Sequence, residues 1–123
     1  MIHYTPVAKF RFAQWLWDWL FAQSRFAFEW DAGNSIKSLD KHGVTCEEAE
    51  EVFTERRFIP LGEQHQPPCP EPRFGVLGET AKGELMFLAF TLRNQNIRVI
   101  SARPMNKKER KFYASLRQKR IRV

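Results

Sequence analysis

The chain has 123 residues, 43% of them hydrophobic and 28% charged, a composition that suits one folded domain and excludes general disorder. The net charge of +6 is uneven, because the part from Arg93 onward holds eleven Lys or Arg and one acid. This basic end predicts a polyanion or an acidic protein as partner, and a solvated charged helix is the alternative. Two cysteines outside any CxxC motif exclude a disulfide framework and favour a reduced, cytoplasmic protein.

The first 25 residues predict an amphipathic helical extension. Apolar residues recur at helical spacing, and polar residues share the opposite side. The apolar positions are Phe12, Trp15, Leu16, Trp19 and Leu20, and the polar ones are Arg11, Gln14, Asp18 and Arg25. Packing on the domain core is the favoured role, ahead of binding a partner or a second copy. A membrane role is disfavoured, because the apolar run is too short to span a bilayer and the polar face is not rich in lysine.

The next segment predicts a strand and two helices. "FAFEW" alternates aromatic residues, which is typical of a strand. Asp31 is expected to cap a short helix that carries Ile36 and Leu39 and ends at Gly43. Thr45 and Glu48 have the spacing of a capping box at the start of another helix.

The rest of the chain predicts an antiparallel meander followed by a helix. "RFIPL" indicates a short strand at an edge or with Pro60 near its end, and a proline-rich loop follows it. "RFGVLGE", "LMFLAFTL" and "IRVISAR" indicate three further strands, of which the middle one should be covered on both faces. Asn106 is expected to cap the last helix with Glu109 at its third position. The predicted fold is α+β, with helices packed against one antiparallel sheet.

The motifs for nucleotide, zinc-peptidase and serine-hydrolase sites are absent from the sequence, so no cofactor is expected. His42-x3-Cys46 and His65-x3-Cys69 repeat one spacing that could supply four zinc ligands. One pair straddles a helix corner and the other lies in the proline-rich loop, so chance is the favoured explanation and no metal site is predicted.

Phosphodiester chemistry fits the residues better, because arginine binds two phosphate oxygens at once. Arg73, Arg93, Arg98 and Arg103 all lie on or beside the predicted sheet. On one regular strand Arg98 and Arg103 would point to opposite faces, so both could serve one site only if Arg103 turned over the strand end. His42 could be an acid or base, or a helix C-terminal cap.

Tyr113 could donate a proton or dock the last helix, and docking is favoured. Glu109 is expected to belong to the helix cap.

Three blocks in the right order resemble the BrnT toxins, once called DUF497. They are "FEWDAGNSIKSLDKHGVTCEEAEEVF", "RFGVLGETAKGELMFLAFTLR" and "IRVISARPMNKKERKFY". Their most specific pieces are Trp30-Asp31, Lys41-His42-Gly43 and the run from Ile100 to Arg103. The chain departs from the usual family pattern at Asn34, Ser38 and Cys46, and residues 1–25 lie outside the usual family start.

The resemblance implies a RelE-like toxin domain over residues 26–123 that acts as a metal-independent ribonuclease and arrests translation. It also implies neutralisation by a BrnA-like antitoxin, with operator DNA bound only by the toxin–antitoxin complex. Matched by motif, the implied catalytic residues are Lys41, His42, Arg93 and Arg103. The expected RNA-binding residues are Arg73, Arg98, Lys107, Lys108, Arg110 and Lys111. The alternative is a non-catalytic basic module that binds an antitoxin or nucleic acid.

Overall fold

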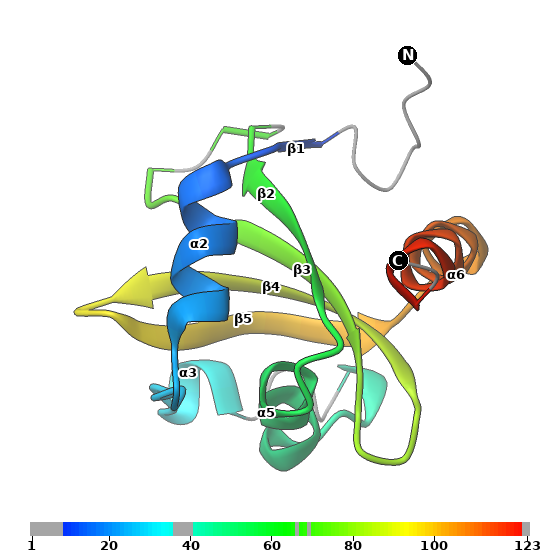
Figure 1. The fold of residues 1–123 in the computed structure, drawn as a ribbon. Helices are drawn as coiled ribbons and strands as arrows, with labels where there is room; N and C mark the ends of the chain where they lie inside the picture. Colours follow the sequence, from blue (N-terminus) through cyan, green and yellow to red (C-terminus); the bar gives the residue numbers. More distant parts are fainter. Residues whose placement is uncertain (1–8, 36–40, 66, 69, 122–123) are drawn as a thin grey trace.

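A computed structural model describes residues 9–35, 41–65, 67–68 and 70–121, and shows an α+β fold built on one five-stranded sheet (Figure 1). The strands lie in the order β1-β2-β3-β4-β5, and each pair of neighbours is antiparallel. Their bounds are β1 Phe10–Arg11, β2 Ile59–Gln64, β3 Phe74–Glu79, β4 Leu85–Arg93 and β5 Asn96–Pro104. The α+β class and the antiparallel meander are therefore confirmed.

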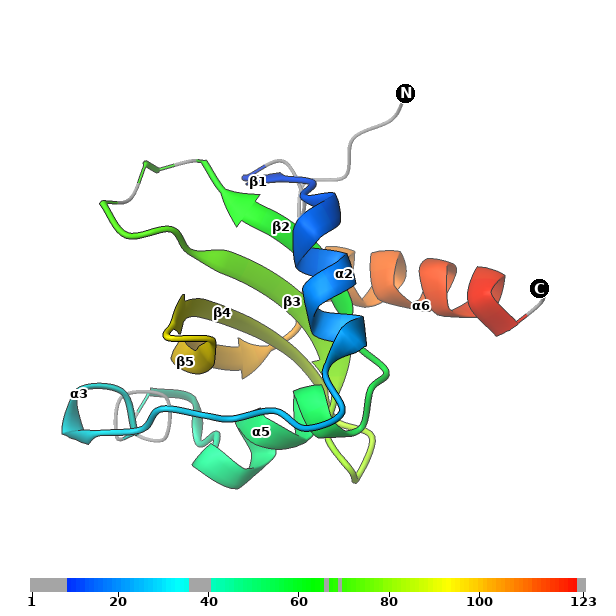
Figure 2. The same ribbon diagram turned by 60° about the vertical axis from the view of Figure 1, so that its left-hand side comes forward.

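The described helices cover the sheet from both sides (Figures 1 and 2). They are α2 Gln14–Ala22, α3 Ala32–Ser35, α5 Cys46–Thr54 and α6 Lys107–Ile121. Leu16 and Leu20 of α2 pack with Val52 and Phe53 of α5 on one face, in a core with Phe90 of β4. A second core on the other face joins β2, β3 and β4 to α6, with the members Ile59, Leu61, Leu77, Phe87, Ala89, Met105 and Tyr113. Strand β4 is buried on both faces, as its near-continuous apolar sequence predicts.

The local start and stop signals of the helices are confirmed. Thr45 accepts a hydrogen bond from the Glu48 backbone N–H, and the Glu48 carboxylate accepts one from the Thr45 backbone N–H. Asn106 and Glu109 make the same reciprocal pair at the start of α6. Gly43 has φ +71°, the left-handed conformation that suits a residue after a helix end. Ile36 and Leu39 lie outside the described residues.

The strand predicted at "FAFEW" is wrong. Only an isolated parallel bridge between Phe28 and Ile97 is present there. The Ile97 N–H donates to the Ala27 carbonyl, and the Glu29 N–H donates to the Ile97 carbonyl. The segment therefore covers the start of β5 without continuing as a sixth strand, since the chain turns into α3 after Asp31.

The N-terminal helix is present, but its buried side is narrower than predicted. Leu16 and Leu20 are fully buried in the first core, whereas Trp15 is 50% exposed. Phe12 precedes the helix and is 62% exposed. A helix that lies on a sheet edge buries only the stripe facing the sheet, which the spacing alone does not define. None of the helices in the described residues is long and apolar enough to cross a membrane.

Candidate active site on the sheet

A bulge in β5 places the sheet arginines on one face. Ala89 pairs with Ser101 and Phe90 pairs with Val99, so Ile100 is an extra residue in β5. One extra residue reverses the alternation of side chains along the strand beyond it. Arg98 and Arg103 therefore point to the same face, so β5 is not the regular strand assumed from the sequence and Arg103 need not turn over the strand end to share a site with Arg98. Arg73, just before β3, and Arg93, at the end of β4, share this face, which we name the arginine face (Arg73, Arg93, Arg98 and Arg103).

Arg103 is held in a fixed orientation on this face. Its two terminal nitrogens donate to the two carboxylate oxygens of Glu109, at 2.7 and 2.8 Å. The guanidinium also stacks on the ring of Phe87, 4.3 Å from its centroid. Phe87 is the cross-strand partner of Arg103, so the sheet register itself creates this contact. Glu109 is 2% exposed, and it caps α6 at the same time. The cap thus connects the helix start to Arg103.

A pocket of about 340 Å³ lies beside this pair. Basic side chains predominate among the described charged residues that line it, and Glu109, already paired with Arg103, is the single acid among them. We name it the arginine pocket, and its lining residues are Lys9, Phe10, Gln64, Pro67, Arg73, Phe87, Ala89, Ser101, Arg103, Asn106, Lys108 and Glu109. A cleft of this composition suits an anion such as a phosphate group.

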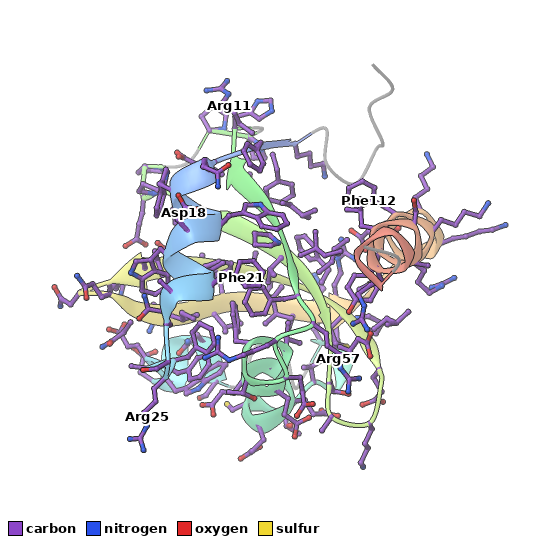
Figure 3. The ribbon with its side chains drawn as sticks, viewed as in Figure 1. Arg11, Asp18, Phe21, Arg25, Arg57 and Phe112 are labelled. Carbon is purple, nitrogen blue, oxygen red and sulfur yellow. The ribbon has the colours of Figure 1, made fainter. Side chains whose placement is uncertain are left out.

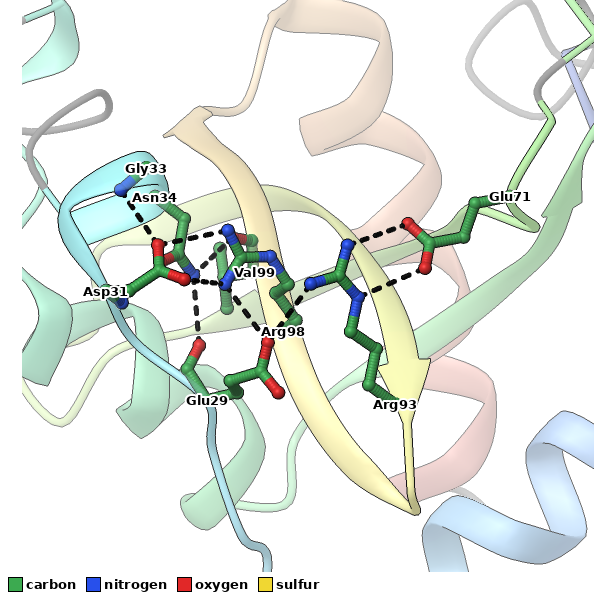
Figure 4. Close-up of polar contacts among 8 residues, drawn as sticks. All are labelled: Glu29, Asp31, Gly33, Asn34, Glu71, Arg93, Arg98 and Val99. Carbon is green, nitrogen blue, oxygen red and sulfur yellow. Dashed lines mark hydrogen bonds and ion pairs between the residues drawn. The ribbon is translucent and has the colours of Figure 1, made fainter.

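The other two sheet arginines are engaged with carboxylates (Figure 4). Arg98 makes a bidentate contact with Asp31 at 2.9 and 3.1 Å, and its side chain is only 14% exposed. Arg93 makes a bidentate contact with Glu71 at 3.1 and 3.3 Å. Both arginines also contact the same oxygen of Glu29. These pairs fasten two segments to β4 and β5: the segment that carries Glu29 and Asp31, and the loop that carries Glu71.

The pairing changes the titration of the carboxyl groups. Hydrogen bonds from Arg98 hold the pKa of Asp31 below its ordinary value, and those from Arg93 lower the pKa of Glu71. The same contacts raise the pKa values of Arg98 and Arg93 further above their ordinary range. All four groups therefore remain charged at neutral pH. A phosphate that approaches these two arginines must compete with the carboxylates.

A smaller pocket of about 180 Å³ borders this network. It is lined by Gly33, Asn34, Glu71, Arg73, Thr91, Arg93, Arg98 and Ile100. Arg73 lines both this pocket and the arginine pocket, so the two hollows adjoin along one sheet face. This continuous basic path over the sheet is the candidate site.

A comparison with protein families places the chain in a known group. The profile described as the ribonuclease toxin, BrnT, of type II toxin–antitoxin systems matches residues 30–109. The chain belongs to the BrnT family. No curated protein matches the chain significantly. The BrnT match includes every member of the arginine face and ends at Glu109, whereas β1 and α2 precede it. Membership implies an RNA substrate and a protein antitoxin.

The BrnT-type motif residues divide into two groups in space. Arg73, Arg93 and Arg103 line the two adjoining pockets, as do Arg98 and Lys108. Lys41 and His42 are exposed, helical residues just before Gly43, and they line neither pocket. Their catalytic role stays a prediction.

The remaining predicted RNA contacts, Lys107, Arg110 and Lys111, are exposed on α6. The Arg110 side chain also donates to the Met105 carbonyl, at 2.8 Å.

Three site residues were missed by the sequence reasoning. Asn34 is buried, and its amide nitrogen donates to the Glu29 and Val99 carbonyls, both at 3.0 Å. Ser101 and Lys9 line the arginine pocket. The departure at Asn34 from the usual BrnT pattern was a signal for the first, but Ser101 required the bulge and Lys9 required β1. Tyr113 is buried and hydrogen-bonded to the Arg57 carbonyl and to Glu79, in agreement with the favoured docking role.

No group of three or more His, Cys, Asp or Glu side chains in the described part of the chain is arranged to hold a metal ion. Cys69, one of the four residues in the zinc hypothesis, lies outside the described residues. Cys46 is a free, half-buried thiol whose pKa is raised by burial.

Proposed function

We propose that the chain is an endoribonuclease toxin that cleaves RNA without a metal ion and uses its arginine face to bind the scissile phosphate. The observation that carries this proposal is the arginine pocket, in which Arg103, Arg73 and Lys108 surround one hollow. Metal-dependent nucleases hold Mg²⁺ with carboxylates. Among the described residues that line the arginine pocket, the single carboxylate is already paired with Arg103, so cations from the chain itself are the better match to the phosphate charge.

In this proposal the 2′-hydroxyl of the substrate attacks the adjacent phosphorus, and the 5′-oxygen leaves. The bond to the 5′-oxygen breaks as the bond to the 2′-oxygen forms, which yields a 2′,3′-cyclic phosphate and a free 5′-hydroxyl. Negative charge accumulates on the phosphoryl oxygens in the transition state, where fixed cations stabilise it most. Arg103 is suited to this because Phe87 and Glu109 hold its guanidinium before substrate arrives. Lys41 and His42 are proposed for proton transfer or charge stabilisation on the basis of the family resemblance.

The proposal extends to the partners. A BrnA-like antitoxin would neutralise the toxin, and the complex of the two would bind operator DNA. The basic surface of α6, with Lys107, Lys108 and Lys111 exposed, supports contact with an RNA backbone or with an acidic antitoxin segment. RNA cleavage in the cytoplasm would arrest translation.

The test is cleavage of end-labelled single-stranded RNA in buffer containing EDTA, followed by analysis of the product ends. Arg103→Ala and Arg73→Ala should each lower the cleavage rate, by about 100-fold or more for Arg103 if its cation acts on the transition state. Arg25→Ala is the matched control, because Arg25 is exposed and points away from the body of the protein (Figure 3).

Two results would contradict the proposal. One is cleavage that EDTA abolishes or that leaves no cyclic phosphate. The other is growth arrest that persists in Arg103→Ala while antitoxin binding is lost, which would favour the non-catalytic binding module. Separate His42→Ala and Lys41→Ala variants test the two motif residues that lie outside the pockets.

A further inference from the structure

A third hollow lies at the N-terminal edge of the sheet, where residues that precede the part matching the BrnT profile meet Glu63 and His65. It has a volume of about 240 Å³ and is lined by Arg11, Phe12, Ala13, Trp15, Glu63 and His65. We name it the aromatic pocket. Its two aromatic side chains, Phe12 and Trp15, are the most exposed of the large hydrophobic residues described. Exposed aromatic rings beside a cation are typical of surfaces that stack nucleic-acid bases.

Trp15 is held firmly although half of it is exposed. Its ring meets the ring of Phe74 edge to face, with centroids 5.3 Å apart. Phe74 is buried in the first core, so this contact anchors Trp15 to the sheet. A ring that is fixed before binding loses little conformational entropy when a base stacks on it. The contact with Phe74 therefore explains the position of Trp15, but core packing does not account for the half of the side chain that is exposed.

The aromatic pocket and the arginine pocket lie on opposite sides of the same narrow sheet edge. Phe10 pairs with Gln64, and both line the arginine pocket. Arg11 pairs with Glu63, and both line the aromatic pocket. Successive side chains on a strand point to opposite faces, so β1 separates the pockets by the width of one strand. Because β1 has only two residues, a bound chain could pass over it from one pocket to the other.

We propose that the aromatic pocket is a nucleobase-binding subsite, in which Trp15 and Phe12 stack a base of the same single-stranded RNA whose phosphate lies at Arg103. This inference rests on the proposed ribonuclease function. Lys9 lines the arginine pocket and Arg11 lines the aromatic pocket, so cations flank the strand where the phosphate backbone would cross. Figure 3 shows Arg11 beyond the end of the sheet, projecting outward from β1. A duplex would keep its bases stacked inside, so the subsite selects unpaired RNA.

The subsite is tested by binding with RNA that cannot be cleaved. The probe is a short single-stranded 2′-O-methyl RNA, which lacks the attacking hydroxyl, with 2-aminopurine placed at each position in turn. The fluorescence of 2-aminopurine falls when the base stacks on an aromatic ring. The wild-type protein should quench the signal strongly at the position that occupies the pocket. Trp15→Ala should remove that quench and weaken binding about tenfold or more.

Three variants make the test specific. Trp15→Tyr retains an aromatic ring and should keep most of the quench. Phe12→Ala changes the most exposed ring, so it should reduce binding while leaving the fold intact. Phe21→Ala is the matched control, since Phe21 is a partly exposed aromatic residue of the same helix that does not line the pocket. Thermal unfolding of each variant separates loss of the subsite from loss of the fold.

The outcomes distinguish this inference from the function on which it rests. Unchanged quenching and affinity in folded Trp15→Ala and Phe12→Ala would overturn the subsite, while cleavage by the wild-type protein would still support the ribonuclease. Weaker antitoxin binding with unchanged RNA binding would also overturn it, because the surface would then be a protein-docking site. Absence of cleavage by the wild-type protein would instead refute the proposed function.

Discussion

Replacing Glu109 with glutamine tests whether the helix cap and the phosphate-binding arginine depend on each other. Glu109 accepts hydrogen bonds from the Asn106 backbone N–H and from both terminal nitrogens of Arg103. Glutamine retains one oxygen for the cap, but its amide NH₂ then faces a guanidinium N–H. The substitution therefore removes the charge and half of the bidentate contact while changing the side-chain volume very little.

The expected cost is about 2–3 kcal/mol in the free energy of unfolding. A hydrogen bond to a charged group contributes about 1.5–3 kcal/mol, and removal of one partner from a buried ion pair costs about 3–5 kcal/mol. A cost at the low end of these two ranges is expected, because the Arg103 side chain is 34% exposed and can be solvated. For a chain of this length the corresponding fall in melting temperature is about 10 °C.

The assay is urea unfolding of the wild type, the two single variants and the double variant of Arg103→Met and Glu109→Gln. The effects of the single changes should sum to about 2 kcal/mol more than the effect of the double change, because the pair is lost only once. Glu47→Gln, the same chemical change at an exposed position, should stay within about 0.5 kcal/mol of the wild type. Additive effects of the two single variants would refute the coupling of cap and site.

Three further predictions concern the frame around the site. Thr45→Ala should lower the free energy of unfolding by about 1 kcal/mol in a urea titration, because it removes a side-chain acceptor from the capping box; an unchanged midpoint would contradict this. Gly43→Ala should cost about 1–2 kcal/mol by the same measurement, since φ is +71° there, and Gly43→Asn should cost clearly less; equal costs would contradict the backbone explanation. Burial and the hydrogen bond to Glu79 raise the pKa of Tyr113 from 10.0 to about 12. Stability from this group is therefore present below about pH 10 and is lost as the pH rises toward 12, and melting curves should show a smaller alkaline loss for Tyr113→Phe than for the wild type.

Local sequence patterns predicted most of the helices and strands that surround the site. The capping boxes at Thr45 and Asn106, the glycine stop at Gly43 and the three long strands all depend on contacts between residues close in sequence. Each device satisfies backbone groups that any helix end or strand must satisfy, so it leaves a recognisable pattern. The exception was "FAFEW", where the aromatic alternation reflects packing against the core and the backbone makes only one bridge to β5.

The site depended on contacts that the sequence does not encode locally. The four arginines were identified as a group, but the face of Arg103 depends on the bulge at Ile100, and a bulge leaves no fixed residue signature. Lys9 enters the arginine pocket through β1, a strand of only two residues that pairs with a segment more than fifty positions away. The burial of Asn34 likewise depends on the Val99 carbonyl, which is distant along the chain.

The bulge at Ile100 also has a consequence for how such sites evolve. Point substitutions in β5 change one side chain at a time, whereas one residue more or fewer decides whether the strand needs a bulge to stay in register with β4. With Arg103 five positions after Arg98, a β5 that lacked the bulge would turn one of the two arginines to the opposite face. The ability of this strand to hold phosphate therefore depends on the bulge as well as on its residue types. Relatives with one residue fewer between Arg98 and Arg103 should have a regular β5 in this stretch and still carry both arginines on one face.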